Sequence, residues 1–224
     1  MSHRLSSLLA LALLCAGVSA VQAQQPSAEM LTHLKRAVVI VTTYDDHGKP
    51  LLQGSGFFIT PEYVVTNLHV INHASRVRIE TFAGQTVAVG SIAATDGNSD
   101  LALLQIDAPH PDTTVLQPEY AAPFEGESIF VLSSPQGSRW KTTLGRVGTM
   151  WNLSGTGRRL QITASLRPGS SGGPVLNQQG RVIGIAAMHI RSADDLDFAV
   201  PAEDLKTLQA SAAVFAARAA APGR

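Results

Sequence analysis

Between residues 36 and 201 the chain consists of short apolar runs separated by turn-forming residues. The runs are rich in Val, Ile, Leu and Thr, and Gly, Pro, Asn and Asp stand between them, which is typical of many short β-strands. Long amphipathic helices do not alternate with these runs, so a parallel α/β sheet is not expected. The pattern predicts an all-β chain with strands at residues 37–44, 54–60, 63–67, 77–81, 86–94, 101–106, 128–132, 141–151, 159–163, 174–176 and 182–189.

Two segments depart from the strand pattern. Residues 108–124 carry three proline-bearing turns and divide the strands into two groups, so we interpret them as the connection between two β-barrels. After Pro201 the composition favours a helix, with acidic residues in its first turn. The buried face of this helix is expected to contain Leu205, Leu208 and Phe215. The expected domain boundaries are an N-terminal segment at 24–35, a two-barrel domain at 36–206, and the helix end with an Ala-rich tail at 207–224.

Residues 1–23 have the pattern of a cleavable signal peptide. Arg4 precedes an apolar run at residues 8–18, and small residues then lead to Ala23, where we expect cleavage, with Ala20 as the alternative. The apolar run is shorter than the roughly 20 residues that a membrane-spanning helix needs, and no later run is long enough. We therefore expect no membrane span and a mature chain that is periplasmic or secreted.

The composition limits the partners and the covalent links of the mature chain. Cys15 is the only cysteine and would leave with the signal peptide, so no disulfide is expected. A lipidated cysteine would normally follow a small residue, whereas Leu14 precedes Cys15. The chain has 17 basic and 17 acidic residues, and removal of Arg4 would leave a slight acidic excess. No nucleic-acid partner is expected from this balance.

The glycine-rich segment at residues 167–177, RPGSSGGPVLN, is the most specific candidate for chemistry. Glycines at 169, 172 and 173 allow a tight turn that presents Ser171 beside several backbone N–H groups. A developing oxyanion needs such donors, and losing one typically costs about 3 to 4 kcal/mol of transition-state stabilisation. A predicted strand follows directly, so the turn is expected to be held firmly.

The same residues also fit the G-x-S-x-G elbow of α/β-hydrolases. That fold places an acid and then a histidine after the serine. Here His189 comes before the aspartates of residues 194–197, and too little chain follows for the rest of such a fold. We exclude the elbow on this order.

A nucleophilic serine needs a base, and His69 is the strongest candidate because two predicted strands and a turn precede it. His69 and His73 are four residues apart, but a metalloprotease helix needs a glutamate at the position of Val70, so no metal and no cofactor are expected. Asp100 stands directly before a predicted strand and could orient the base, although such a residue is also a common turn cap. The other histidines lie in the signal peptide, in turns, in the linker or at a strand end: His3, His33, His47, His110 and His189.

Together the segments GSGFFIT, VVTNLHVI, SDLALLQI and RPGSSGGPVLN resemble the trypsin-like serine peptidases, most closely the bacterial HtrA (Deg) type. Weaker matches extend the resemblance over about residues 36–206. The resemblance implies two six-stranded antiparallel β-barrels, a C-terminal helix, polypeptide substrates and serine endopeptidase activity. It gives no oligomeric state.

The resemblance also implies roles for individual residues. The catalytic triad falls on His69, Asp100 and Ser171, and the oxyanion hole on the N–H groups of Gly169 and Ser171. The strand that would pair with substrate supplies the implied substrate-binding residues Ala187, Met188 and His189.

The sequence departs from the family pattern at three places. Residues 207–224 are expected to form only a helix end and a tail, not the PDZ domain that usually follows in the family, and Ala186 and Ala187 stand where the family often has a hydroxyl that binds the triad aspartate. No aspartate stands six residues before Ser171, so a small or medium apolar residue is expected before the cleaved bond. A homologue that binds peptides without cutting them is the alternative to a peptidase, and a serine esterase is a further one.

Overall fold

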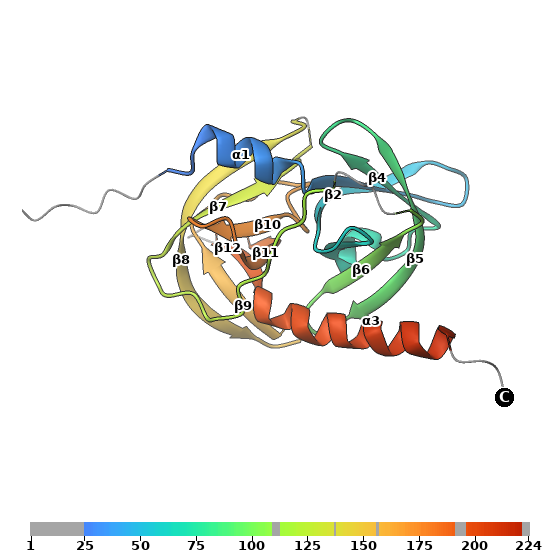
Figure 1. Ribbon diagram of the computed structural model, residues 1–224. Helices are drawn as coiled ribbons and strands as arrows, with labels where there is room; N and C mark the ends of the chain where they lie inside the picture. The colour runs from blue at the N-terminus through green and yellow to red at the C-terminus, as the bar shows by residue number, and fades with distance from the viewer. Residues whose placement is uncertain (1–24, 109–112, 137, 156, 191–195, 221–224) are drawn as a thin grey trace, which may run out of the picture.

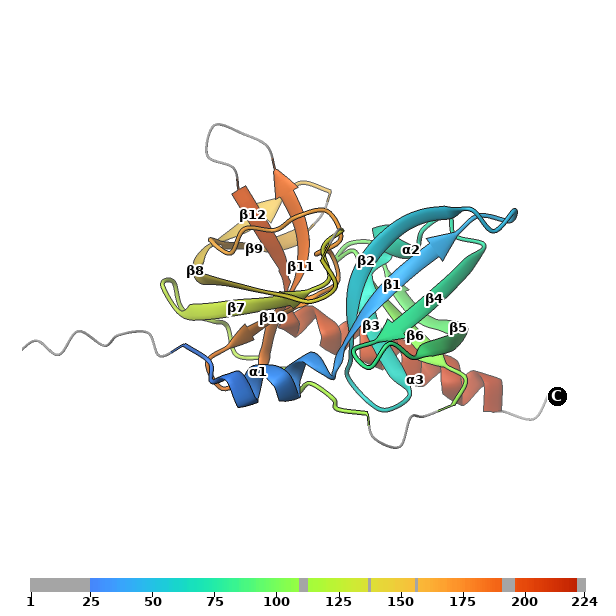
Figure 2. The same cartoon turned by 90° about the horizontal axis from the view of Figure 1, so that it is seen from above.

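The structure is a computed structural model that describes residues 25–108, 113–136, 138–155, 157–190 and 196–220, with backbone only at 188–190 and 214–220. Its strands form two closed barrels that lie side by side (Figure 1). Figure 2 shows the same two barrels from above.

The first barrel is built from six antiparallel strands in the order β1-β2-β3-β6-β5-β4. A short helix, α2 (Leu68–Ile71), follows the third strand. The strands are β1 (Val38–Tyr44), β2 (Pro50–Phe58), β3 (Tyr63–Asn67), β4 (Arg76–Thr81), β5 (Thr86–Asp96) and β6 (Leu101–Ile106).

The second barrel has six antiparallel strands in the order β10-β11-β12-β9-β8-β7. They are β7 (Ser128–Ser133), β8 (Lys141–Leu153), β9 (Gly157–Ile162), β10 (Pro174–Asn177), β11 (Val182–Ile190) and β12 (Leu196–Pro201). The predicted fold class, two six-stranded antiparallel barrels with a C-terminal helix, is confirmed. Strand β12 is an element that the sequence pattern did not predict.

Strands near the junction of the barrels are buried on both faces, which explains why their apolar runs are continuous. In β6, Ala102 and Leu104 belong to the core of the first barrel, whereas Leu101 and Leu103 belong to a cluster that also contains Phe130 of the second barrel. Successive side chains on a strand point to opposite faces, so a strand buried on both sides reads as an unbroken apolar run. A hydrophobic layer therefore joins the two barrels.

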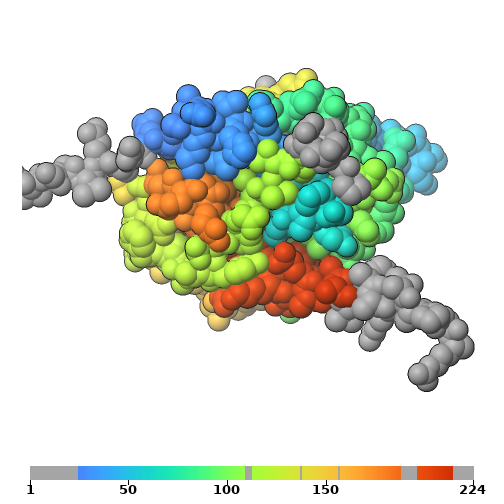
Figure 3. Space-filling model, in the orientation of Figure 1, coloured from blue at the N-terminus to red at the C-terminus, as the bar shows by residue number. Residues whose placement is uncertain are grey.

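The segment that links the barrels follows this junction. Leu116 N–H donates to the carbonyl of Phe58 in the first barrel, at 2.9 Å. Val182 N–H in the second barrel donates to the Gln117 carbonyl, also at 2.9 Å. Figure 3 shows linker residues on the surface between the barrels.

The two longer helices lie on the outside of the barrels (Figures 1 and 2). Helix α1 (Ala28–Lys35), which was not predicted, begins at Ser27, whose hydroxyl accepts the N–H of Met30. After the short η1 (Ala202–Asp204), helix α3 (Leu205–Ala220) packs on β5 and β6 of the first barrel (Figures 1 and 2). Leu205 and Leu208 are fully buried as predicted, and the side chain of Phe215 lies outside the description. In the described part of the chain, none of the helices has the length and apolar character needed to cross a membrane.

Candidate active site

His69 lies at the junction of the barrels, on the short helix α2. The helix follows β3 directly, and the buried side chains of Val70 and Ile71 anchor it in the core of the first barrel. Leu68 N–H donates to the carbonyl of Asp100 at 3.0 Å, so the start of the helix is tied to the turn before β6. The backbone of His69 is thus fixed, while its side chain is 47% exposed.

Asp100 holds the histidine at two points. Its Oδ2 lies 2.6 Å from His69 Nδ1, and its Oδ1 accepts the backbone N–H of His69 at 2.9 Å. Asp100 has a φ of 61°, a left-handed conformation that is uncommon for residues other than glycine and tolerated by aspartate. With a proton on Nδ1 directed to the carboxylate, Nε2 is the ring nitrogen left to accept a proton.

The turn that carries Ser171 depends on glycine. Gly172 has a φ of 87°, and a Cβ there would lie 2.0 Å from the carbonyl oxygen of Ser55. Gly172 N–H donates to the Ala186 carbonyl at 2.8 Å, and Gly173 N–H donates to the Ser170 carbonyl at 3.0 Å. The sequence-based prediction of a tight, firmly held turn agrees with this geometry.

The two neighbouring serines of the turn have different environments. Ser170 is 3% exposed, and its hydroxyl oxygen accepts the Arg167 N–H at 3.2 Å and a hydroxyl from Ser133 at 3.3 Å. Ser171 is half-buried, and its hydroxyl donates to the Ala187 carbonyl at 3.1 Å. Within the described residues no hydrogen bond joins Ser171 to His69. Ser171 is therefore the more accessible of the two.

The backbone N–H groups of Gly169 and Ser171 have no acceptor among the described residues. Gly169 has a φ of 94°, and its carbonyl accepts the hydroxyl of Ser55 at 2.8 Å. The carbonyl of Ser171 accepts the N–H of Ser55 at 2.7 Å. Ser55 of the first barrel thus holds the carbonyls of both residues, while the N–H groups of Gly169 and Ser171 remain available as donors.

Ser55, on β2, was not predicted as part of the site. It is fully buried, and its hydroxyl oxygen also accepts the N–H of Ser134 at 2.9 Å. Its carbonyl accepts the hydroxyl of Thr66 at 2.8 Å. One residue of the first barrel therefore holds both ends of the Gly169 to Ser171 turn in the second barrel. The only sequence signal was its place between two glycines, 54 and 56.

The strand predicted to bind substrate lies next to the serine turn. Ala186 N–H donates to the Gly173 carbonyl at 2.8 Å, and Ala187 is 3% exposed. Met188 and His189 continue β11 and pair with Phe198 and Asp197 of β12. Their side chains lie outside the description, so a role in binding stays a prediction.

Arg159, on β9, is another residue that the sequence did not single out. It is fully buried, its Nη1 donates to the Arg158 carbonyl at 2.8 Å, and its Nε and Nη2 have no hydrogen-bond partner among the residues that the structure describes. Burial lowers the pKa of the Arg159 guanidinium, and the negative charges of Asp100, Asp204 and Asp96 act in the opposite direction. A buried cation thus lies within the electrostatic range of Asp100.

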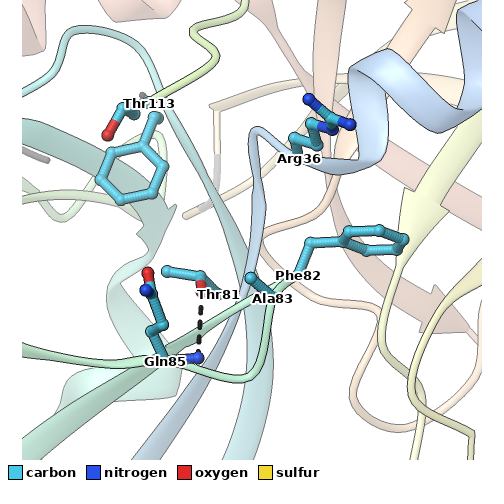
Figure 4. Close-up of a pocket in the computed structure, with 7 residues that line it drawn as sticks. Arg36, Thr81, Phe82, Ala83, Gln85 and Thr113 are labelled. Carbon is cyan, nitrogen blue, oxygen red and sulfur yellow. Dashed lines mark hydrogen bonds between the residues drawn. The ribbon is translucent and has the colours of Figure 1, made fainter. Parts of the chain in front are cut away.

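A cavity of about 460 Å³ lies on the first barrel and contains none of the predicted site residues. Figure 4 shows Arg36 and Phe82 on one side of it and Thr113 and Gln85 on the other. Next to it, Phe82 contacts Trp140 of the second barrel with ring centroids 5.4 Å apart. This cavity is separate from the His69 and Ser171 region.

His69 and His73, four residues apart in the sequence, have different surroundings in the structure. The described residues hold no group of three His, Cys, Asp or Glu side chains that could bind an ion. His73 is exposed with a φ of 67°, and the Nδ1 of His69 is engaged by Asp100.

Two closed six-stranded antiparallel barrels, with a His–Asp pair and a glycine-rich serine turn at their junction, define the trypsin-like class of proteins. Residues 54–185 match the family described as the trypsin-like peptidase domain. The chain belongs to this family.

Individual relatives agree with this assignment. Serine protease Do-like HtrA of Bacillus subtilis is 31% identical over 176 residues, which cover 69% of this chain and 38% of that protein. Anti-sigma-I factor RsgI9 of Acetivibrio thermocellus is 29% identical over 170 residues, covering 76% of this chain and 24% of that protein. The chain therefore spans less than half of the length of either curated relative.

Solved structures share the fold. The active form of the Rv3671c protease from M. tuberculosis superposes with a TM-score of 0.73 at 22% identity, covering 84% of this chain and 88% of that one. The serine endoprotease from Yersinia pestis superposes with a TM-score of 0.71 at 24% identity, covering 84% of this chain and 68% of that one.

Proposed function

We propose that this chain is a serine endopeptidase that hydrolyses peptide bonds in polypeptide substrates through an acyl-enzyme. In this proposal Ser171 is the nucleophile, His69 is the general base and Asp100 orients the histidine. The observation that carries the proposal is the two-point contact of Asp100 with the Nδ1 and the backbone N–H of His69. That contact leaves Nε2 of the imidazole as the acceptor for a serine proton.

The mechanism begins with a rotation of the Ser171 side chain. Its hydroxyl now donates to the Ala187 carbonyl, and a change of rotamer by about 120° redirects it. His69 Nε2 takes the hydroxyl proton as Oγ attacks the carbonyl carbon of the substrate, and Asp100 stabilises the imidazolium.

The next steps use the two free amides. The negative charge on the tetrahedral intermediate is stabilised by the N–H groups of Gly169 and Ser171, which have no acceptor among the described residues. His69 then gives its proton to the leaving amine, and water hydrolyses the acyl-enzyme with His69 again as base.

Substrate binding and location complete the proposal. The backbone of β11 at Ala187, Met188 and His189 pairs with the substrate chain, next to the hydroxyl of Ser171. We infer from residues 1–23 that the chain is exported and acts in the bacterial envelope or outside the cell.

Intact-mass spectrometry after exposure to a fluorophosphonate tests the nucleophile. One adduct is expected on the wild type and on Ser170→Ala, and none on Ser171→Ala. Ser170→Ala is the matched control because it changes the adjacent hydroxyl, which is buried. An adduct on Ser171→Ala, or its loss on Ser170→Ala alone, would place the nucleophile elsewhere.

A second function is a peptidase homologue that binds a peptide or protein without cutting it. The observation in its favour is that the hydroxyl of Ser171 is bonded to the Ala187 carbonyl and not to His69. This function predicts no adduct on any variant, together with peptide binding that persists in Ser171→Ala.

A further inference from the structure

The position of Arg159 on β9 places its side chain between the barrels. Its neighbour Leu160 points into the core of the second barrel, so Arg159 points outward. It is nevertheless fully buried, because the turn before β6 packs on the start of β9. A Cβ at Gly157 would lie 3.2 Å from the carbonyl oxygen of Asn98 and 4.0 Å from Arg159 Nη1. The guanidinium therefore lies beside the turn that carries Asp100.

This cation has no direct ionic partner in the described part of the chain. Its one hydrogen bond is to the Arg158 carbonyl, and Nε and Nη2 are unpartnered. A buried charge is costly unless opposite charges compensate it. The groups that act on it are Asp96 and Asp100 around the turn of the first barrel, and Asp204 on η1. The adjacent cation, Arg158, is paired with Glu203 and Asp204 at the surface.

The carboxylate of Asp100 has few partners of its own. Both of its hydrogen bonds come from His69, although two carboxylate oxygens accept up to about four. On β11 of the second barrel, Ala186 and Ala187 carry no polar side chain that could donate to it. A positive charge beside the turn that carries Asp100 would partly offset the negative charge of this carboxylate without a direct contact.

We propose that Arg159 is a positioning residue of the His69–Asp100 pair, whose buried positive charge partly offsets the negative charge of Asp100 and so disfavours the protonated form of His69. This inference rests on the proposed function. Its consequence is that His69 remains a competent base to lower pH than it would without Arg159. The side chain touches neither substrate nor the reacting atoms, and it acts through Asp100.

The size and the sign of the effect follow from Coulomb's law. For two unit charges at a separation of about 10 Å and an effective dielectric constant of about 20 to 40, Coulomb's law gives a change of roughly half to one pH unit in a proton-binding equilibrium. Removing the positive charge favours the imidazolium. In the variants without this charge, the rise of kcat/KM on the acidic side of its pH profile (the acid limb) should therefore move to higher pH by this amount.

Three variants of the full chain test the proposal. Arg159→Met and Arg159→Gln remove the charge, and Gln retains a donor for the Arg158 carbonyl. Apolar replacement of a buried ion commonly preserves the fold, and circular dichroism checks it. Arg159→Lys keeps the charge, and Arg158→Gln is the matched control because it removes an exposed, paired cation from the adjacent position.

We expect the acid limb to shift by about half to one pH unit in both neutral variants and by less than about 0.2 unit in Arg159→Lys and Arg158→Gln. A purely structural role would lower the plateau and leave the limb in place. An unmoved limb in whichever neutral variant folds would overturn the proposal.

A titration that needs no activity separates this inference from the proposed function. In the Ser171→Ala background, the ring signals of His69 are followed by NMR from pH 4 to 9, with and without Arg159→Met, and are assigned by their loss in His69→Asn. The midpoint should rise when the charge is removed. A midpoint that is unchanged or falls refutes the role of Arg159 even if the chain hydrolyses peptides, and a rise supports it even if the chain does not.

Discussion

Replacing Ser55 by alanine should damage both stability and the serine turn. The change removes the hydroxyl that donates to the Gly169 carbonyl at 2.8 Å and accepts the Ser134 N–H at 2.9 Å. Both groups are buried, and each one left without a partner costs about 1 to 3 kcal/mol. We therefore expect the free energy of unfolding to fall by about 2 to 6 kcal/mol, a large share of a typical domain's stability. The bond from the Ser55 N–H to the Ser171 carbonyl is retained, so the turn should loosen without being released.

Urea denaturation followed by circular dichroism measures the loss, and kcat/KM measures its effect on the turn. Displacement of the Gly169 amide should lower kcat/KM by about tenfold, less than the roughly hundredfold or greater loss seen when an oxyanion donor is removed completely. Ser133→Ala is the control, because Ser133 is also buried but its hydroxyl bonds only to another hydroxyl, at 3.3 Å. If Ser55→Ala and Ser133→Ala lose equal stability, the proposed bracing by the first barrel is incorrect.

Other expected outcomes follow from the same structure. Asp100→Asn should leave the fold intact and lower kcat by about ten-thousand-fold, since the amide would favour the wrong tautomer of His69; a loss below tenfold in steady-state assays would contradict this. Gly172→Ala should destabilise by about 2 to 5 kcal/mol through its positive φ and its contact with Ser55, whereas Gly97→Ala, which meets nothing within 4 Å, should be nearly neutral in the same melts. Burial raises the pKa of Asp204, so its charge costs stability at neutral pH; Asp204→Asn should raise the Tm at pH 7, and the gain should vanish as the pH falls through this raised pKa. The hydrogen bond from Arg158 lowers the pKa of Glu203, so Glu203→Gln should lower the Tm at pH 7 but not below the range where the free carboxyl titrates.

The parts of the fold that could be predicted are those whose side chains alternate regularly. Strands β3 and β6 have the bounds expected from the sequence, because most of their residues face one of two buried layers. Strand β12 was missed because Asp197 interrupts its apolar run. In the structure Asp197 is 6% exposed and its Oδ1 accepts the Leu166 N–H at 3.1 Å, a long-range contact that no local pattern reveals.

Sequence motifs pointed to the residues of the candidate site but not to those that support them. His69, Asp100 and Ser171 stand in recognisable segments, and the structure brings His69 and Asp100 into direct contact. Ser55 and Arg159, to which no motif pointed, are both fully buried. An arginine beside Leu160 in a strand is ordinarily expected to face water, whereas Arg159 is fully buried close to the Asn98 turn.

The most direct test of the account is hydrolysis of an unfolded, disulfide-free polypeptide by the purified chain in water enriched in heavy oxygen, followed by mass spectrometry of the products. The proposed mechanism predicts internal cleavages whose new carboxyl termini carry the heavy oxygen, made by the wild type and by Ser170→Ala but not by Ser171→Ala or His69→Ala. Intact substrate with the wild type, or equal cleavage by Ser171→Ala, would contradict the claim that this chain is a serine endopeptidase acting through Ser171.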